Sequence, residues 1–133
     1  MNTTPPTPSR AFGLATFGTL AHAVLLLGLF VLYVVYVPAA KKTFDEYGLT
    51  LPWATFSAIR LSNWVAGNWW ALVPVLVFVG AADFWMTDGL RAHNRFAAVV
   101  WVVGVGLALA AVAALTVFAI ELPMMKLKEG LAR

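Results

Sequence analysis

The chain has no cysteine and very little charge. None of its 133 residues is cysteine, which excludes disulfides, thiolate metal sites and cysteine nucleophiles. Only 11% of the residues are charged, whereas 62% are hydrophobic, and the mean hydropathy is +0.84. Paired carboxylates, a phosphate-binding glycine loop, a metal-ligand cluster and a nucleophile–base set are all missing from the sequence. The sequence therefore predicts a protein that is not an enzyme.

Three stretches lack charged residues altogether, at 11–40, 61–82 and 96–120. Each exceeds the roughly 20 residues that a helix needs to cross a bilayer core of about 30 Å. The core offers no water to backbone N–H and C=O groups, so these stretches must be helices. The sequence predicts an all-α integral membrane protein that crosses the membrane several times, with spans at about 12–37, 65–83 and 96–121.

The remaining residues form tails and short connections around one membrane domain at 12–125. Residues 1–11 are rich in proline and threonine and are expected to be disordered, and residues 126–133 form a basic tail. Pro52 suits the first turn of a helix, and an amphipathic pattern follows it. We therefore expect a helix at 52–64 that lies in the membrane interface and leads into the second span.

Charged and proline residues are expected to end the spans. Asp83 closes the second span and opens a polar turn to residue 95, and Pro123 breaks the third helix. Pro74 is expected to kink the second span. Gly48 suits a left-handed cap after a short polar helix that continues the first span.

The net charge of +3 comes from basic residues beside the span ends, where lipid headgroups attract them. No basic patch interleaves with aromatic residues, so no nucleic-acid partner is expected. Three basic residues fall on one side of the membrane and six on the other. The count favours the second side as cytoplasmic, but insertion need not follow the total, so the orientation stays open. The tryptophans are expected to anchor both interfaces, in two groups: Trp53, Trp64, Trp69 and Trp70, and Trp85 and Trp101.

His22 is the strongest single candidate for a functional residue. It lies about ten residues, or ~15 Å, into the first span, and an ionisable group at that depth marks a functional site by default. Gly18, one turn away, could admit a flat ring, a spacing similar to that of bacterial light-harvesting polypeptides, whose histidine ligates bacteriochlorophyll. A tetrapyrrole cofactor on His22 therefore stays open as an alternative. The other interpretation is a neutral histidine bonded to a neighbouring backbone or hydroxyl group.

Asp83 and Glu121 are expected to reach water at the ends of their spans. Helix rise places Asp83 about 10 Å from His22 in depth, so a direct contact between them is not expected. A transporter or channel component remains a further alternative, although such a path needs several buried polar groups around one cavity.

Small residues in the third span predict close helix packing. Gly106, Ala110 and Ala114 recur every four residues, with Gly104 nearby, and small residues let two helices approach closely within a membrane. We expect the face to pack against other membrane-protein subunits or a second copy of the chain.

An ordered set of positions extends from the end of the first span to the C-terminus. Val37-Pro38 ends the span, Gly48 and Leu51-Pro52 form a turn, and a threonine, a serine and two tryptophans follow before a final Leu-Pro. The set resembles the membrane portion of the type II secretion and type IV pilus inner-membrane platform family (F-protein, PilC-like). The matching positions are Pro38, Gly48, Leu51, Pro52, Thr55, Ser62, Trp69, Trp70, Leu122 and Pro123.

The resemblance implies a reduced transmembrane core of that family, because the chain lacks room for the family's two cytoplasmic helical domains. It also implies a bacterial inner membrane. Together with the composition, it leads us to expect a small non-enzymatic subunit in the assembly or scaffolding of a larger complex, without a cofactor.

Overall fold

The structure is built from three long helical rods and one short crossing helix. The computed structural model describes residues 12–131, of which 93% are helical. The elements are α1 (Phe12–Val31), the π-helical segment η2 (Leu32–Tyr36), α2 (Val37–Glu46), α3 (Trp53–Gly67), α4 (Trp69–His93) and α5 (Arg95–Leu131). Three helices are long and apolar enough to cross a membrane, at 15–46, 69–93 and 95–130. The all-α prediction with three such helices is confirmed.

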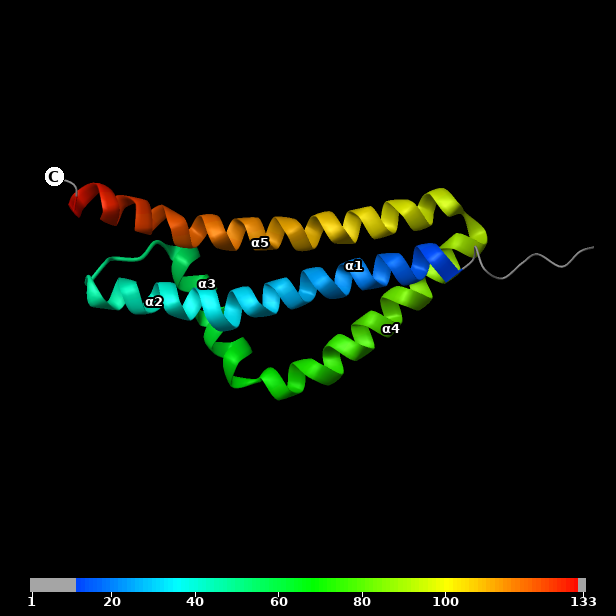
Figure 1. Cartoon of the computed structure of the whole chain (residues 1–133), viewed down its shortest axis with the longest axis horizontal. Helices are drawn as coiled ribbons and strands as arrows, with labels where there is room; N and C mark the ends of the chain where they lie inside the picture. Colours follow the sequence, from blue (N-terminus) through cyan, green and yellow to red (C-terminus); the bar gives the residue numbers. More distant parts are fainter. Residues whose placement is uncertain (1–11, 132–133) are drawn as a thin grey trace, which may run out of the picture.

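The three rods meet around α1. Figure 1 shows α1, η2 and α2 as one continuous helix that lies alongside α5. Near the α4–α5 turn α4 approaches α1, and it diverges from α1 toward its other end, where α3 crosses between the rods. The start of α1 and the α4–α5 turn therefore lie at one end of the molecule, and α3 and the end of α5 lie toward the other.

Two helices continue past the residues at which the sequence predicts their ends. The prediction that Asp83 ends a helix is wrong, because α4 continues to His93. The prediction that Pro123 breaks the third helix is also wrong, because α5 continues through it to Leu131. The expected polar turn at 83–95 is reduced to one non-helical residue, Asn94.

The boundary between α3 and α4 also differs from the predicted one. Helix α3 occupies the place of the predicted amphipathic helix. It does not lead directly into the second span, because Asn68 separates α3 from α4, and α4 begins at Trp69 rather than near residue 65. Gly48 has φ +60°, as expected for a left-handed cap after α2. Whether α3 lies in the membrane interface stays a prediction. Its buried residues are Thr55, Ala58, Ile59 and Ser62.

The helix can continue through Pro123 because α3 supplies the hydrogen bond that proline lacks. In an α-helix the N–H of residue 123 would bond to the carbonyl of Ala119, but proline has no N–H. The Thr55 hydroxyl donates to that carbonyl at 2.6 Å, and Thr55 is fully buried. The carbonyl freed by Pro123 is therefore satisfied from another helix, and α5 does not need to end.

The same compensation occurs at Pro38. In η2 the N–H of Val37 bonds to the carbonyl of Leu32, five residues back. In that register the carbonyl of Tyr33 would require the N–H of residue 38, which proline lacks. The Ser62 hydroxyl donates to the Tyr33 carbonyl at 2.5 Å. Two hydroxyls of α3, seven residues apart, thus join α3 to α5 and to η2 at proline-freed carbonyls.

The buried core lies beneath α3, at the end of the molecule where α3 crosses between the rods. It consists of apolar side chains from η2, α2, α3 and α5: Tyr33, Val37, Ala40, Phe44, Ala58, Ile59 and Ile120. The rods are tied together here by both apolar contact and hydrogen bonds. At the other end, where α1, α4 and α5 meet, polar contacts and a cavity dominate instead.

Candidate functional site

A polar cluster joins α1, α4 and α5 through His22 and Asp83. The Nδ1 atom of His22 lies 2.8 Å from Oδ2 of Asp83, and their side chains are only 5% and 10% exposed. The expectation that these two residues lie too far apart for a contact is wrong. Because α4 continues to His93, Asp83 lies ten residues, or about 15 Å, inside its helix, which matches the depth of His22 in α1.

Two further donors hold the Asp83 carboxylate. Thr19 Oγ1 donates to Oδ2 at 3.2 Å, and the indole Nε1 of Trp101 donates to Oδ1 at 3.0 Å. The carboxylate therefore has partners from both neighbouring rods. A carboxylate in an apolar setting requires hydrogen-bond partners. Because the protein supplies them, α4 can continue past Asp83 without exposing this residue to water.

The hydrogen bonds of His22 fix the number of protons in the cluster. Its Nε2 lies 2.9 Å from the carbonyl oxygen of Val102, which can only accept, so Nε2 carries a hydrogen. The Nδ1–Oδ2 contact at 2.8 Å also requires a proton, on the nitrogen or on the oxygen. Either His22 is cationic beside an anionic Asp83, or both are neutral. The pair has no net charge in either case, which suits a site deep in a span.

Two glycines bring the helices close enough for these bonds. A Cβ built on Gly18 would lie 2.8 Å from a Val102 methyl carbon, and one on Gly106 would lie 3.8 Å from His22 Nε2. Gly106 therefore lies beside the imidazole ring, where a Cβ would make an ordinary van der Waals contact. Gly18 accommodates the Val102 side chain, so the space beside His22 is filled by protein rather than by a flat ring.

The structure gives the tetrapyrrole alternative no support. Both ring nitrogens of His22 are occupied by hydrogen-bond partners, Asp83 and Val102, whereas a metal needs an unprotonated ring nitrogen.

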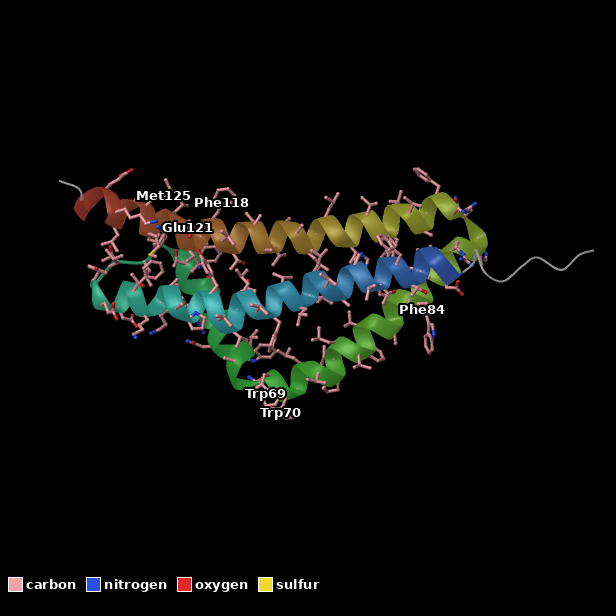
Figure 2. The ribbon with its side chains drawn as sticks, in the orientation of Figure 1. Trp69, Trp70, Phe84, Phe118, Glu121 and Met125 are labelled. Carbon is pink, nitrogen blue, oxygen red and sulfur yellow. The ribbon has the colours of Figure 1, made fainter. Side chains whose placement is uncertain are left out.

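A second polar cluster ties η2 to α5. The Thr116 hydroxyl donates to the Val112 carbonyl at 2.9 Å, so the Tyr33 hydroxyl donates to Thr116 Oγ1 at 2.8 Å. The Tyr36 hydroxyl donates to Glu121 Oε1. Figure 2 shows Glu121 near the C-terminal part of α5. Glu121 is half-buried with a protein partner, so the expectation that it simply reaches water is incomplete.

A cavity of about 850 Å³ opens between α1, α4 and α5, with the His22–Asp83 cluster in its wall. Apart from Thr19, His22, Asp83 and the tryptophan indoles, its lining is apolar. Thr19, His22, Asp83 and the Trp101 indole in that wall are hydrogen-bonded within the protein. A transporter or channel role for the cavity stays a prediction.

The four predicted packing residues of α5 do not share one environment. Gly106 faces His22 and Leu25 of α1, whereas a Cβ on Gly104 would meet nothing within 4 Å. Ala110 and Ala114 are exposed. Only Gly106 therefore contributes to packing within the chain, and the other three positions face outward.

The positions that carry the family resemblance come together only in part. Pro38, Thr55, Ser62 and Pro123 share the compensation described above, in which α3 hydroxyls satisfy proline-freed carbonyls. Leu51 packs against the core. Gly48 and Pro52 shape the connection into α3, and Trp69 and Trp70 begin α4 (Figure 2). Leu122 is exposed.

No family model, curated protein or solved structure matches this chain. The platform-family resemblance is therefore carried by the residues above alone.

Trp101 and Thr19 were not predicted as partners of Asp83. Trp101 was expected in an interfacial belt, but its indole nitrogen bonds to Asp83 inside the bundle. The sequence did contain a signal for Thr19, because this residue lies three residues before His22 and therefore on the same side of a helix. Trp101 gave no comparable signal, since its contact depends on how α5 packs against α4.

Proposed function

We propose that the chain is a small non-enzymatic membrane subunit that acts in the assembly or scaffolding of a larger inner-membrane complex. The observation that carries the proposal is the joining of all three rods by buried side-chain hydrogen bonds. The His22–Asp83 cluster joins α1, α4 and α5 at one end, and at the other Thr55 joins α3 to α5 and Ser62 joins α3 to η2. A unit held in this way presents fixed outer faces to its neighbours.

The outer face of α5 is the surface that we propose for a partner helix. Ala110 and Ala114 lie one turn apart and are exposed, next to Gly106, which is in contact with α1. Small residues at such positions let another helix approach closely and pack its side chains against the backbone. The partners are other membrane-protein subunits or a second copy of the chain, within the lipid bilayer.

Because of the resemblance to the secretion and pilus platform family, we propose that the complex is an inner-membrane platform of that kind. Support comes from Pro38, Thr55, Ser62 and Pro123, which belong to the resemblance and act together in one structural arrangement. The proposal for this chain is limited to a transmembrane scaffold, located in a bacterial inner membrane.

The test compares two bulky substitutions on α5. Ala110→Phe obstructs the proposed face, and Ala108→Phe is the matched control, exposed about 160° away around the same helix. Complexes are extracted from the host membrane in mild detergent and sized by native electrophoresis, and the bound subunits are identified by mass. We expect Ala110→Phe to release the partner subunits while the variant still inserts and folds.

Retention of the same large complex by Ala110→Phe, at wild-type yield, contradicts the proposed face. A wild-type protein that runs as a lone monomer under every mild extraction contradicts the scaffold function itself.

A further inference from the structure

The cavity beside the His22–Asp83 cluster is elongated along the spans. On α4 its wall extends from Trp69 to Met86, and Asp83 lies near its inner end. Trp69 and Asp83 are fourteen residues apart, which corresponds to about 21 Å along the helix axis. On α1 the wall extends from Thr19 to Phe30. The cavity is therefore a slot parallel to the rods rather than a round pocket.

One end of the slot lies at a membrane interface. Asp83, near the other end, lies about 15 Å from the His93 end of α4. The interfacial end of the slot is at Trp69, which is 58% exposed beside Trp70 (Figure 2), and exposed tryptophans favour the headgroup level. The slot thus extends inward from that interface to the His22–Asp83 cluster.

The chemistry of the slot suits a hydrocarbon chain. Its long wall is formed by side chains such as Leu26, Phe30, Leu72, Leu76 and Leu109. Near the inner end the Asp83 oxygens already accept from Thr19, His22 and Trp101. A guest therefore needs no polar group at its inner end.

The slot is narrow relative to its length. Spreading about 850 Å³ over about 21 Å gives a mean cross-section of about 40 Å². The length and the mean cross-section of the slot suit a slender chain. Its volume lies within the roughly 300–1,000 Å³ of small-molecule sites.

We propose that this slot binds one acyl chain of a phospholipid from the leaflet on the Trp69 side. The chain lies parallel to α4, with its methyl end toward Asp83 and its headgroup near Trp69 and Trp70. Chain entry is lateral, since Phe78 in the wall is 74% exposed. The inference is independent of the scaffold function, because it concerns a different face of the bundle.

Gly80 allows a direct test. It lines the slot, and a Cβ built on it meets nothing within 4 Å, so a leucine there would enter the slot without a clash. Gly104 on α5 is the matched control, because its Cβ also meets nothing within 4 Å and it does not line the slot. Gly80→Leu and Gly104→Leu thus make the same chemical change inside and outside the site.

The experiment uses the full chain purified in dodecyl maltoside and titrated with palmitoyl-oleoyl-phosphatidylglycerol. Native mass spectrometry counts the phospholipids that each protein retains. We expect wild type and Gly104→Leu to retain one phospholipid, and Gly80→Leu to bind it at least about tenfold more weakly. Circular dichroism checks that both variants keep their helices, and Leu76→Trp, which also fills the slot, replaces Gly80→Leu if that variant does not fold.

Chain position is tested with the same lipid brominated near the methyl end of one chain. We expect it to quench tryptophan fluorescence in wild type and Gly104→Leu, and to quench it less in the slot-filling variant. Equal phospholipid retention by all three proteins overturns the proposal. A dimer that Gly80→Leu converts to a monomer, with lipid retention unchanged, also overturns it and assigns the slot to a second copy of the chain.

Discussion

Ser62→Ala tests the compensation at Pro38 most sharply. The change removes the hydroxyl that donates to the Tyr33 carbonyl, which no backbone N–H can reach in the π-helical register before proline. A buried carbonyl without a partner costs about 1–3 kcal/mol, and side-chain hydrogen bonds in membrane proteins average about 0.6 kcal/mol with a maximum near 1.7. We expect Ser62→Ala to lower the free energy of unfolding by about 1–2 kcal/mol.

The second half of the test restores the missing donor. Pro38→Ala gives residue 38 an N–H, and the Tyr33 carbonyl then has a backbone partner whether the turn stays wide or relaxes to an α-helix. In that background Ser62→Ala should cost less than about 0.5 kcal/mol. The double-mutant cycle should therefore report a coupling of about 1 kcal/mol between positions 38 and 62.

The assay is reversible unfolding of the purified protein in dodecyl maltoside by sodium dodecyl sulfate, followed by circular dichroism. Ser57→Ala is the control, because Ser57 is a half-buried serine on the same helix whose side chain has no hydrogen bond among the residues described. Its effect should be the same in both backgrounds. If Ser62→Ala costs the same with proline and with alanine at residue 38, the reasoning is refuted.

Two further predictions follow from the same contacts. Thr55→Ala should lower the free energy of unfolding by about 1–2 kcal/mol. In a Pro123→Ala background most of that loss should disappear, because an alanine N–H at residue 123 could bond to the Ala119 carbonyl. The same loss from Thr55→Ala in both backgrounds, in the same titration, would contradict this. His22→Leu should destabilise by about 3–5 kcal/mol because Asp83 loses its His22 partner and keeps only Thr19 and Trp101, whereas the double variant with Asp83→Leu should recover most of the loss. A double variant less stable than His22→Leu would show that the pair itself stabilises the fold.

Sequence patterns identified the helices well because the membrane imposes them. Length and apolarity alone require internally bonded rods, and three such rods are present. The left-handed conformation of Gly48 could also be predicted, since a glycine after a short polar helix favours the left-handed cap that the structure contains.

The helix ends were missed for one physical reason. The sequence predicts that helices end at Asp83 and at Pro123, because a carboxylate needs polar partners and proline lacks a donor. Both needs are met by distant segments: Thr19, His22 and Trp101 for Asp83, and Thr55 for the carbonyl before Pro123. Such partners depend on tertiary packing, so a pattern read along one helix could not reveal them.

The same error hid the candidate site. With α4 ending at Asp83, the carboxylate and His22 would differ in depth by about 10 Å. With α4 continuing to His93, they lie at one level. The cavity was likewise unpredictable, since it depends on the divergence of α4 from α1 (Figure 1).

The three rods pack as one unit, with Gly18 of α1 against Val102 of α5. Engineered cysteines test this packing directly because the chain has no cysteine of its own. A Cβ built on Gly18 lies 3.6 Å from the Cβ of Val102, within the roughly 3.5–4.5 Å of disulfides. We predict that Gly18→Cys with Val102→Cys forms an intramolecular disulfide on oxidation in native membranes, whereas Gly28→Cys with Val102→Cys does not. No cross-link in the first pair, or equal cross-linking in both, would contradict the packing of α1 against α5.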